Sequence, residues 1–310
     1  MVSSSPPRPA GPLRVTLAYC FCFLTWGSTW AVAKVALEDV PPLRLVGVRM
    51  LLAGLVLVPF IRTQEGSLQK GDWGRVMAVG ALQIGLPFGM MFVGQQWIAS
   101  SWAALLFATY PVWVLLVGRV LMPDQHLTPR KLLAAVLGVT GVGALQYAQL
   151  GALAVSGSVV VGGLLILSAA GLLSVANVLV KQHLGHVPPH LMVCVQTLTS
   201  SLPLLGASFV FEAGASVHWT PRALGALVWL ALGGTVVTYQ LFYWLLPRLT
   251  LSALGAMALL DALVAVVLGV GVLREPLTPS VLVGGLLILS ATVLANRTPS
   301  EPAPTAPETR

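Results

Sequence analysis

Long apolar stretches are the feature that most limits what this chain can fold into. Val159–Val180 contains no Asp, Glu, Lys or Arg, and Leu251–Leu273 contains one such residue. Each exceeds the roughly 18 residues that mark a helix able to cross a bilayer. Charged residues make up only 9% of the chain, whereas soluble domains carry about 25%. The sequence therefore predicts an all-α membrane protein that crosses the bilayer many times.

Hydropathy and turn signals place ten transmembrane helices in this sequence. Most connections are short, as at Pro41-Pro42 and Thr278-Pro279, and short connections make neighbouring helices antiparallel. Residues 1–13 and 297–310 lack an apolar period and are expected to be disordered tails. The expected spans are Val15–Leu37, Leu43–Ile61, Trp73–Ile98, Ser100–Leu121, Pro129–Gln149, Ser158–Gln182, Pro189–Phe211, Pro221–Leu246, Leu251–Leu273 and Pro279–Ala295.

Turn signals of the first half recur in the second half, which indicates an internal repeat. The recurring pairs are Lys34 with Lys181, Pro41-Pro42 with Pro188-Pro189, and Leu127-Thr128-Pro129 with Leu277-Thr278-Pro279. Residues 14–150 and 151–296 are therefore predicted to form two five-helix repeats. Because each repeat has an odd number of helices, the second is inserted upside down relative to the first. Inverted repeats with a site between them are typical of secondary transporters.

Two short motifs resemble a known family. Trp26-Gly27-Ser28-Thr29, followed by Pro42 and Arg49, is similar to the opening of EamA-like proteins of the drug/metabolite transporter superfamily. Residues 273–278, Leu-Arg-Glu-Pro-Leu-Thr, resemble that family's Leu-Gly-Glu-x-Leu-Thr signature. The resemblance runs from Val15 to Ala295. It implies ten helices around a central cavity that helices one, three, four, six, eight and nine line. It also implies transport of small metabolites such as amino acids, often outward.

An acidic residue lies near the middle of the ninth expected span. Placing the carboxylate of Asp261 at the centre of the bilayer costs about 2.5–3.5 kcal/mol. The residue therefore faces a cavity, pairs with a cation or stays protonated. The family often has an acid-Pro pair here, and this chain has Asp261-Ala262. We interpret Asp261 as a substrate-amine anchor or a proton-coupling group; a structural hydrogen bond to a neighbouring helix is the alternative.

Aromatic and amide side chains deep in the expected cavity helices are the other candidates for substrate binding. Residues four apart share a helix face, so Trp26 lies with Trp30, and Tyr239 with Tyr243. Aromatic walls with a few polar groups are typical of small-molecule pockets. An interfacial belt is the alternative for Trp and Tyr near helix ends. The expected substrate-binding residues are Trp26, Trp30, Gln83, Tyr110, Asn177, Tyr239, Tyr243 and Asp261.

Two further charged residues are interpreted as structural. Arg49 lies about two turns inside the second span, and its counterpart in the repeat is the neutral Gln196. It can bind a substrate carboxylate or cap backbone carbonyls at a helix end. Because Arg side chains readily extend to the membrane interface, we favour the structural interpretation. Glu275, in the signature before the last helix, is assigned a structural role as well.

Other chemistries find little support in the sequence. Cys20, Cys22 and Cys194 have no metal-ligand spacing, and no phosphate-binding G-x-x-x-x-G-K motif is present, so no metal, cofactor or ATP is expected. The basic residues are scattered, which argues against nucleic acid. The expected partners are a small-molecule substrate and the lipid bilayer, with proton coupling as a hypothesis. An integral membrane enzyme acting on lipid and a non-transporting structural subunit remain the alternatives.

Lys and Arg residues set the expected orientation, because cytoplasmic loops of membrane proteins are rich in them. With a cytoplasmic N-terminus, twelve of these residues are inside: Arg8, Arg14, Arg62, Lys70, Arg75, Arg119, Arg130, Lys131, Lys181, Arg248, Arg297 and Arg310. Five are outside or within the membrane: Lys34, Arg44, Arg49, Arg222 and Arg274. Both termini are therefore expected on the cytoplasmic side of a bacterial inner membrane.

A reporter fusion tests this orientation. A fusion partner attached after Ala295 should be active if it functions in the cytoplasm and silent if it functions only in the periplasm, because an even number of spans keeps both ends on one side. Activity of a periplasm-only reporter at this position would contradict the predicted topology.

Overall fold

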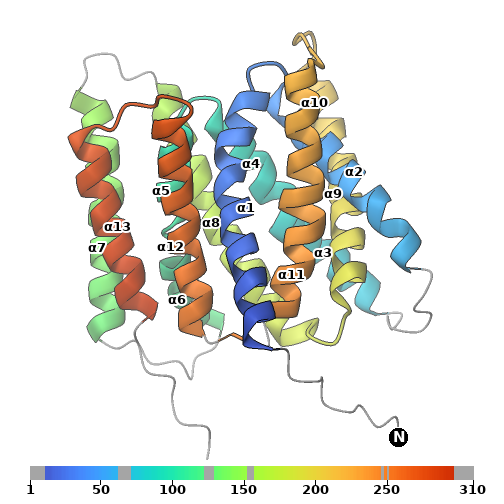
Figure 1. The fold of residues 1–310 in the computed structure, drawn as a ribbon, viewed down its shortest axis with the longest axis horizontal. Helices are drawn as coiled ribbons and strands as arrows, with labels where there is room; N and C mark the ends of the chain where they lie inside the picture. Colours follow the sequence, from blue (N-terminus) through green and yellow to red (C-terminus); the bar gives the residue numbers. More distant parts are fainter. Residues whose placement is uncertain are drawn as a thin grey trace, which may run out of the picture.

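The computed structural model describes residues 11–61, 71–121, 129–151, 157–245, 248–249 and 251–296 (Figure 1). Within these ranges the regular elements are all helices, and no strand occurs. The elements are α1 Pro12–Ala36, α2 Pro42–Ile61, α3 Asp72–Gly80, η1 Ala81–Gly85, α4 Leu86–Gln95, α5 Ser100–Phe107, α6 Tyr110–Leu121, α7 Pro129–Gly151, α8 Gly157–His183, α9 Pro189–Phe211, α10 Pro221–Val228, η2 Trp229–Val237, α11 Thr238–Leu245, α12 Leu251–Gly271 and α13 Pro279–Asn296.

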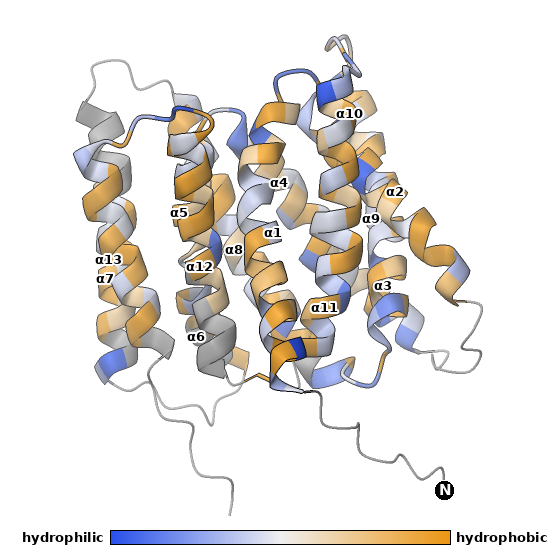
Figure 2. Cartoon of the chain, in the orientation of Figure 1, coloured by the Kyte–Doolittle hydropathy of each residue, from blue (hydrophilic) through white to orange (hydrophobic). Residues whose placement is uncertain are grey.

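In the described part of the chain, seven helical stretches are long and apolar enough to cross a membrane: Pro12–Ala36, Pro42–Ile61, Asp72–Gln95, Ser100–Gly118, Gly157–Val180, Pro189–Phe211 and Pro221–Leu245. Three shorter apolar helices accompany them: Leu133–Ala144, Leu260–Gly271 and Pro279–Leu294. Apolar residues run along the shafts of the helices, and hydrophilic residues gather toward their ends (Figure 2). The predicted all-α membrane class is therefore confirmed, while ten crossings remain a prediction.

The N-terminal helix starts earlier than its expected span. Helix α1 begins at Pro12, so the last two residues of the expected tail 1–13 are helical. Proline fits this position because the first helical N–H has no partner within the helix. Gly11 is the N-cap of this helix, and residues 1–10 and the expected tail 297–310 lie outside the described residues.

One expected span is broken in the structure. Ser100–Leu121 was predicted as a single helix, but α5 ends at Phe107 and α6 starts at Tyr110. Pro111 has no backbone N–H, so the Phe107 carbonyl cannot receive the usual helical bond. At the break, the Thr109 hydroxyl and backbone N–H both donate to the Leu106 carbonyl, at 2.7 Å and 3.2 Å. The proline that the sequence shows inside this span therefore divides the helix.

Two π-helical segments interrupt other spans. Segment η1 separates α3 from α4, and η2 separates α10 from α11. The hydroxyls of Thr235 in η2 and of Thr238 at the start of α11 donate to carbonyls five residues earlier, at 3.0 Å and 2.6 Å. Such wide turns widen the helix locally and are frequent at functional sites. Both segments border the interior of the bundle, as their buried residues show.

Helices that are distant in sequence pack in pairs. Helix α2 packs along α9, α7 along α13, α4 against α8, and α1 against α12. The α7–α13 pair lies at one edge of the bundle, at the left of Figure 1. The largest buried cluster joins side chains from α1, α2, η1, α4, α8, α9 and the α10–α11 stretch. This arrangement brings helices of both halves of the chain around one interior.

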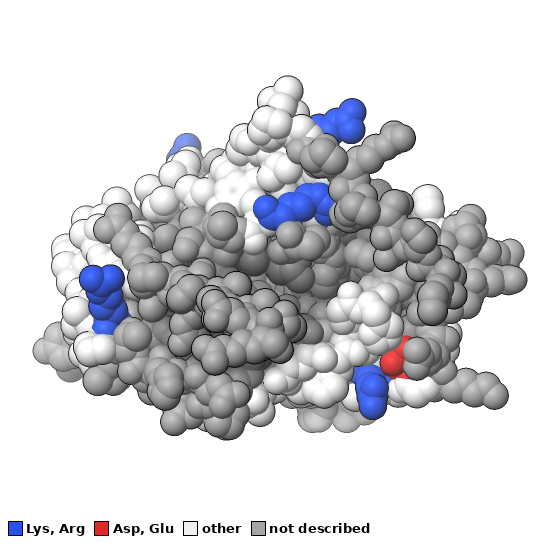
Figure 3. Space-filling view, turned by 90° about the horizontal axis from the view of Figure 1, so that it is seen from below, with Lys and Arg blue, Asp and Glu red and all other residues white. Residues whose placement is uncertain are grey.

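The two ends of the bundle differ in charge. We call the end that holds Pro12 and Asn296 the terminal face, and the end that holds the 37–41 and 212–220 connections the opposite face (Figure 1). Seen from the terminal face, Lys and Arg outweigh Asp and Glu among the described residues (Figure 3). Exposed residues of this face include Arg14, Arg75 and Arg130. The opposite face carries the acids Glu38, Asp39, Glu212 and Glu275 together with the basic residues Lys34, Arg44 and Arg222.

Close contact between α7 and α13 depends on a glycine. A Cβ at Gly141 would lie 2.9 Å from both the Gly284 carbonyl oxygen and the Ile288 backbone nitrogen. On the same helix, a Cβ at Gly143 would have no heavy atom within 4 Å. Backbone atoms cannot move aside as a flexible side chain can, so only Gly141 is essential for the packing.

Gly141→Ala should destabilise the protein by roughly 1–3 kcal/mol, the usual cost of overpacking a tight contact. Gly143→Ala should leave the protein as stable or slightly more stable, because Ala favours helix more than Gly does. Thermal unfolding of the purified variants in one detergent measures the difference. Equal melting temperatures for the two variants would show that α7 and α13 do not pack this closely.

Candidate functional site

A network of amide groups lies in the interior of the bundle and centres on Gln83 in η1. The Gln83 side chain is only 2% exposed. Its Nε2 donates to Asn177 Oδ1 and to the Tyr243 hydroxyl, each at 3.3 Å. Gln196 Nε2 donates to Gln83 Oε1 at 3.1 Å, while Gln196 Oε1 has no partner among the described residues. Four helical stretches, η1, α8, α9 and α11, are thereby joined.

An aromatic cluster adjoins this network. The Trp26 indole N–H donates to the Gly234 carbonyl in η2 at 3.2 Å. Its ring packs edge-on against Tyr239, with centroids 5.5 Å apart, and against Phe242 at 5.1 Å. Tyr239 and Tyr243 pack together at 6.1 Å. Because Tyr243 also accepts the Gln83 bond, the aromatic cluster and the amide network are continuous.

A second aromatic group extends the site toward α12. Tyr110 is hydrogen-bonded to Asn177 and stacks on Phe107 at 5.9 Å. Phe107 packs in turn against Trp30, at 5.5 Å. The Trp30 side chain is hydrogen-bonded to Asp261. The series of contacts therefore ends at the buried carboxyl group.

Asp261 lies in the interior of the protein and is 8% exposed. Trp30 is its hydrogen-bond partner, and its Oδ1 atom has none among the described residues. Helix α1 comes close at this level, since a Cβ at Gly27 would lie 2.7 Å from the Asp261 carbonyl oxygen. No Lys or Arg is within ion-pair distance of Asp261 in the described part of the chain. The carboxyl group is therefore buried without a counter-ion.

The structure brings the eight expected site residues into one connected region. Sequence reasoning missed the apolar Phe107, which joins Tyr110 to Trp30, because nothing polar distinguishes it from other core residues. Sequence reasoning also missed the bond of Gln196 to Gln83, although Gln196 had been identified as the counterpart of Arg49 in the second repeat. The roles of all these residues in substrate binding stay predictions.

The sequence-based interpretation assumed that the Arg49 side chain extends to a membrane interface. In the structure it lies in the interior instead. Its side chain is 2% exposed, because α2 packs between α9 and η2. Its Nε donates to the Thr235 hydroxyl at 3.0 Å. The guanidinium carbon lies 5.1 Å from the Phe88 ring centroid and 5.7 Å from that of Phe92. Arg49 therefore caps no backbone carbonyl in the described structure.

Glu275 connects the last loop to the start of α5 on the opposite face. One carboxylate oxygen accepts from the backbone N–H and hydroxyl of Ser100, at 2.6 Å and 2.7 Å. The other accepts from the same groups of Ser101, at 3.0 Å and 2.6 Å. An anion at a helix N-terminus satisfies free N–H groups and the helix dipole. Glu275 thus caps a helix of the other half of the chain.

Two more acids tie helices together at the opposite face. The Glu212 carboxylate accepts from the backbone N–H groups of Leu43 and Arg44, at 2.7 Å and 3.0 Å. Asp39 accepts from the Thr220 hydroxyl at 2.7 Å and contacts Arg222 at 3.4 Å. The Thr220 hydrogen bond first, and then the Arg222 guanidinium, lower the pKa of Asp39. Each acid therefore connects the first half of the chain to the second.

His183, His186 and His190 lie around the connection between α8 and α9, and His186 is paired with an acid. His186 Nε2 lies 2.9 Å from the carboxylate of the buried Asp72. Within the described ranges, no three His, Cys, Asp or Glu residues are arranged to hold a metal ion.

The fold and this region define an α-helical membrane protein with a polar and aromatic interior. The sequence profile of the EamA-like transporter family matches residues 14–145 and 160–297, and the chain belongs to this family. The family resemblance of the sequence motifs is therefore confirmed. Membership also makes transport the general role of this protein.

Individual relatives agree with this assignment. The chain is 28% identical over 279 residues to the uncharacterized transporter YoaV of Bacillus subtilis, covering 89% of this chain and 94% of the relative. It is 26% identical over 285 residues to a probable amino-acid metabolite efflux pump of Salmonella typhimurium, covering 86% and 89%. A crystal structure with 20% identity has a TM-score of 0.66 and covers 91% of this chain and 96% of its own, which shows a shared fold.

Gln83→Leu tests the amide network. The variant should lose stability on the order of 1 kcal/mol, because it leaves Asn177, Tyr243 and Gln196 without their shared partner. Gln96→Leu is the matched control, since the exposed Gln96 side chain donates to the nearby Val93 carbonyl, and the backbone carbonyl that accepts from Lys34 is kept in the variant. Thermal unfolding of both variants is the measurement. A Gln83→Leu protein as stable as the control would show that the network contributes nothing to folding.

Proposed function

We propose that this protein is a secondary transporter that exports small amphiphilic metabolites, amino acids first among them, by alternating access. The connected region from Trp26 to Asp261 is the observation that carries the proposal. It lies between helices of both halves and combines aromatic walls, amide groups and a carboxyl group without a counter-ion. Such surroundings suit a small solute with an apolar part and polar ends. The similarity to a probable amino-acid metabolite efflux pump supports this substrate class.

Two inverted repeats, 14–150 and 151–296, form the proposed framework. The family profile matches the chain twice, once in each half. Helix pairing supports the same division, because the third span of each half packs on the first span of the other half. Helix α4 packs on α8, and α11 packs on α1. The third span of each half also carries a π-helical segment, η1 or η2. Repeats of this kind provide two equivalent ways of opening a central site.

In the proposed cycle, the described conformation is closed at the opposite face. Glu275, Glu212 and Asp39 link the two halves there through carboxylate hydrogen bonds. Within the first half, the Lys34 ammonium of α1 donates to the carbonyls of Gln95, Gln96 and Ile98 at this face, at 2.8, 3.2 and 2.9 Å. Opening at this face requires the Glu275 contacts with α5 to separate. The basic terminal face is assigned to the cytoplasm, in line with the positive-inside rule.

Asp261 is the proposed coupling group. Burial without a cation favours the neutral carboxyl group, whereas exposure to water favours release of the proton. Alternating access would expose the group to each side in turn, so that a proton enters from one side and leaves to the other. A substrate amine that binds Asp261 would replace the proton as the partner of the carboxylate.

Asp261→Asn keeps the shape of the side chain but cannot ionise. We expect proteoliposomes with this variant to exchange a radiolabelled amino acid, chosen as the one that the wild type transports fastest, yet to fail to concentrate it under a pH gradient. Asp72→Asn is the control, because Asp72 is a buried carboxylate at the terminal face that is paired with His186.

Each outcome of this comparison has a definite meaning. Full accumulation by Asp261→Asn under the pH gradient would remove the coupling role. Loss of both exchange and binding would assign Asp261 to the substrate amine instead. Absence of transport of every amino acid by the wild-type protein would reject amino acids as the substrate class.

A further inference from the structure

We propose that Arg49 is a substrate-binding residue that holds a carboxylate group, so that the site selects apolar solutes with a carboxylate end. This inference rests on the proposed transport function and deepens it by naming the chemistry of one end of the substrate. It replaces the structural role that the sequence alone suggested for Arg49.

The guanidinium of Arg49 is a buried cation without an anion. In the described part of the chain, the contacts of this group are the Thr235 hydroxyl and the rings of Phe88 and Phe92. No Asp or Glu forms an ion pair with it there. Removing a charge from water is costly unless an opposite charge or several hydrogen bonds replace the water. One neutral hydrogen bond leaves most of the five N–H donors of the guanidinium available.

A second hydrogen-bonding side chain, Tyr239, belongs to the same buried cluster as the Phe88 and Phe92 rings that face Arg49. The Tyr239 side chain is within electrostatic reach of Arg49 and is 6% exposed. A carboxylate has two oxygens that accept a bidentate pair of bonds from a guanidinium, and a tyrosine hydroxyl can donate a further one. Arg49 and Tyr239 therefore form a site that is complete only with an anion.

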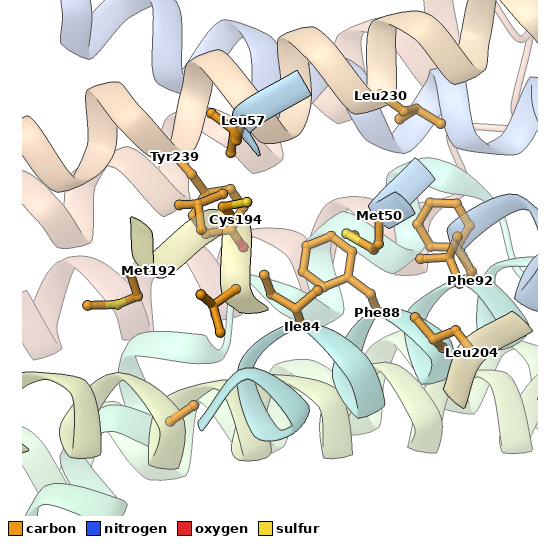
Figure 4. Packing of buried hydrophobic residues seen from close by; sticks show 14 of the residues in the cluster. Met50, Leu57, Ile84, Phe88, Phe92, Met192, Cys194, Leu204, Leu230 and Tyr239 are labelled. Carbon is orange, nitrogen blue, oxygen red and sulfur yellow. The ribbon is translucent and has the colours of Figure 1, made fainter. Parts of the chain in front are cut away.

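The surroundings indicate what the anion carries. Phe88 and Phe92 project from α4 to the same part of the interior as Met50 (Figure 4). On the other side, Trp26 packs on Tyr239. These apolar walls favour an aliphatic or aromatic group attached to the carboxylate over a second charge at that end.

A glycine keeps the backbone close to the guanidinium. A Cβ at Gly234 would lie 3.3 Å from Arg49 Nη2 and 2.7 Å from Thr29 Cγ2. A larger residue there would push η2 away from α1 and α2. The π-helical segment thus contributes a hydroxyl, at Thr235, and a close approach, at Gly234, to the same cation.

Arg44 on the same helix shows the contrast. Its Nε donates to the Ser208 hydroxyl at 2.9 Å, and its guanidinium carbon lies 5.0 Å from the Phe209 ring centroid. Its local contacts are thus of the same kind as those of Arg49. However, Arg44 lies at the membrane end of α2, where the Glu212 carboxylate accepts from Ser208 and from the Arg44 backbone. Arg44 has a nearby anion, and Arg49 has none.

The test compares three small probes on the purified protein: 3-phenylpropionate, its uncharged amide and phenethylamine. Thermal unfolding followed by tryptophan fluorescence reports binding, because a ligand of the folded state raises the melting temperature. We expect 3-phenylpropionate to stabilise the wild type and the amide to stabilise it much less. Arg49→Gln should weaken the binding of the acid by about tenfold or more, since a bond to a charged group is lost. Arg49→Lys should retain part of the affinity, and Arg44→Gln all of it.

The acid-to-amide comparison separates binding from a merely structural role, which would change the stability of Arg49→Gln without changing its preference between probes. If Arg49→Gln does not fold, the proposal is still tested by two measurements: the preference of the wild type for the acid over the amide, and the binding of the acid by Arg49→Lys. Equal stabilisation by acid and amide, or no stabilisation by the acid, would overturn the proposal. Carboxylate binding without any amino-acid transport would support this inference while rejecting the transport proposal. Transport by Arg49→Gln with an unchanged KM would overturn the inference alone.

Discussion

Polar groups at membrane depth have no water to bond with, and the interior of this protein is organised by that constraint. The amide of Gln83 meets it by bonding to Asn177, Tyr243 and Gln196 at once. These bonds hold η1 against α8, α9 and α11, and the aromatic rings of the site pack on the frame so formed. Arg49 and Asp261 do not meet the constraint, since each keeps a buried charge-bearing group without a counter-ion. Gln196 Oε1 in the amide network also has no partner among the described residues, so the interior combines satisfied and unsatisfied polar groups.

At the opposite face, polar groups also find hydrogen-bond partners, but the partners are of another kind. There, carboxylates of one half bind the free N–H groups at helix starts in the other half, as Glu275 does at α5 and Glu212 at α2. These bonds lie near the membrane surface, where water can replace a broken partner at small cost. Links of this type hold two halves together and still separate readily. Deep bonds such as those of Gln83 have no such replacement, so rearrangement is expected at the ends of the bundle first.

Sequence reasoning found the membrane class, the family and the eight candidate site residues that the structure connects. Each of these predictions depends on local signals in the sequence. Runs of apolar residues mark helices, and a lone acid such as Asp261 stands out within one. The break at Pro111 was missed because spanning helices often tolerate proline, so the residue alone does not reveal a divided helix. The environment of Arg49 could not be read from the sequence, since it depends on how far α2 is enclosed by α9 and η2. The number of crossings and the inverted arrangement stay predictions.

In the proposed mechanism, Arg49 and Asp261 contribute in different ways. Burial without an anion penalises the Arg49 cation while the site is empty. Burial without a cation keeps the Asp261 carboxyl group neutral until water or a substrate amine reaches it. A substrate carboxylate at Arg49 would therefore remove a penalty that the empty protein retains. Such a site would favour closure around a loaded substrate over closure around none, which is the condition for coupling substrate binding to a change of access.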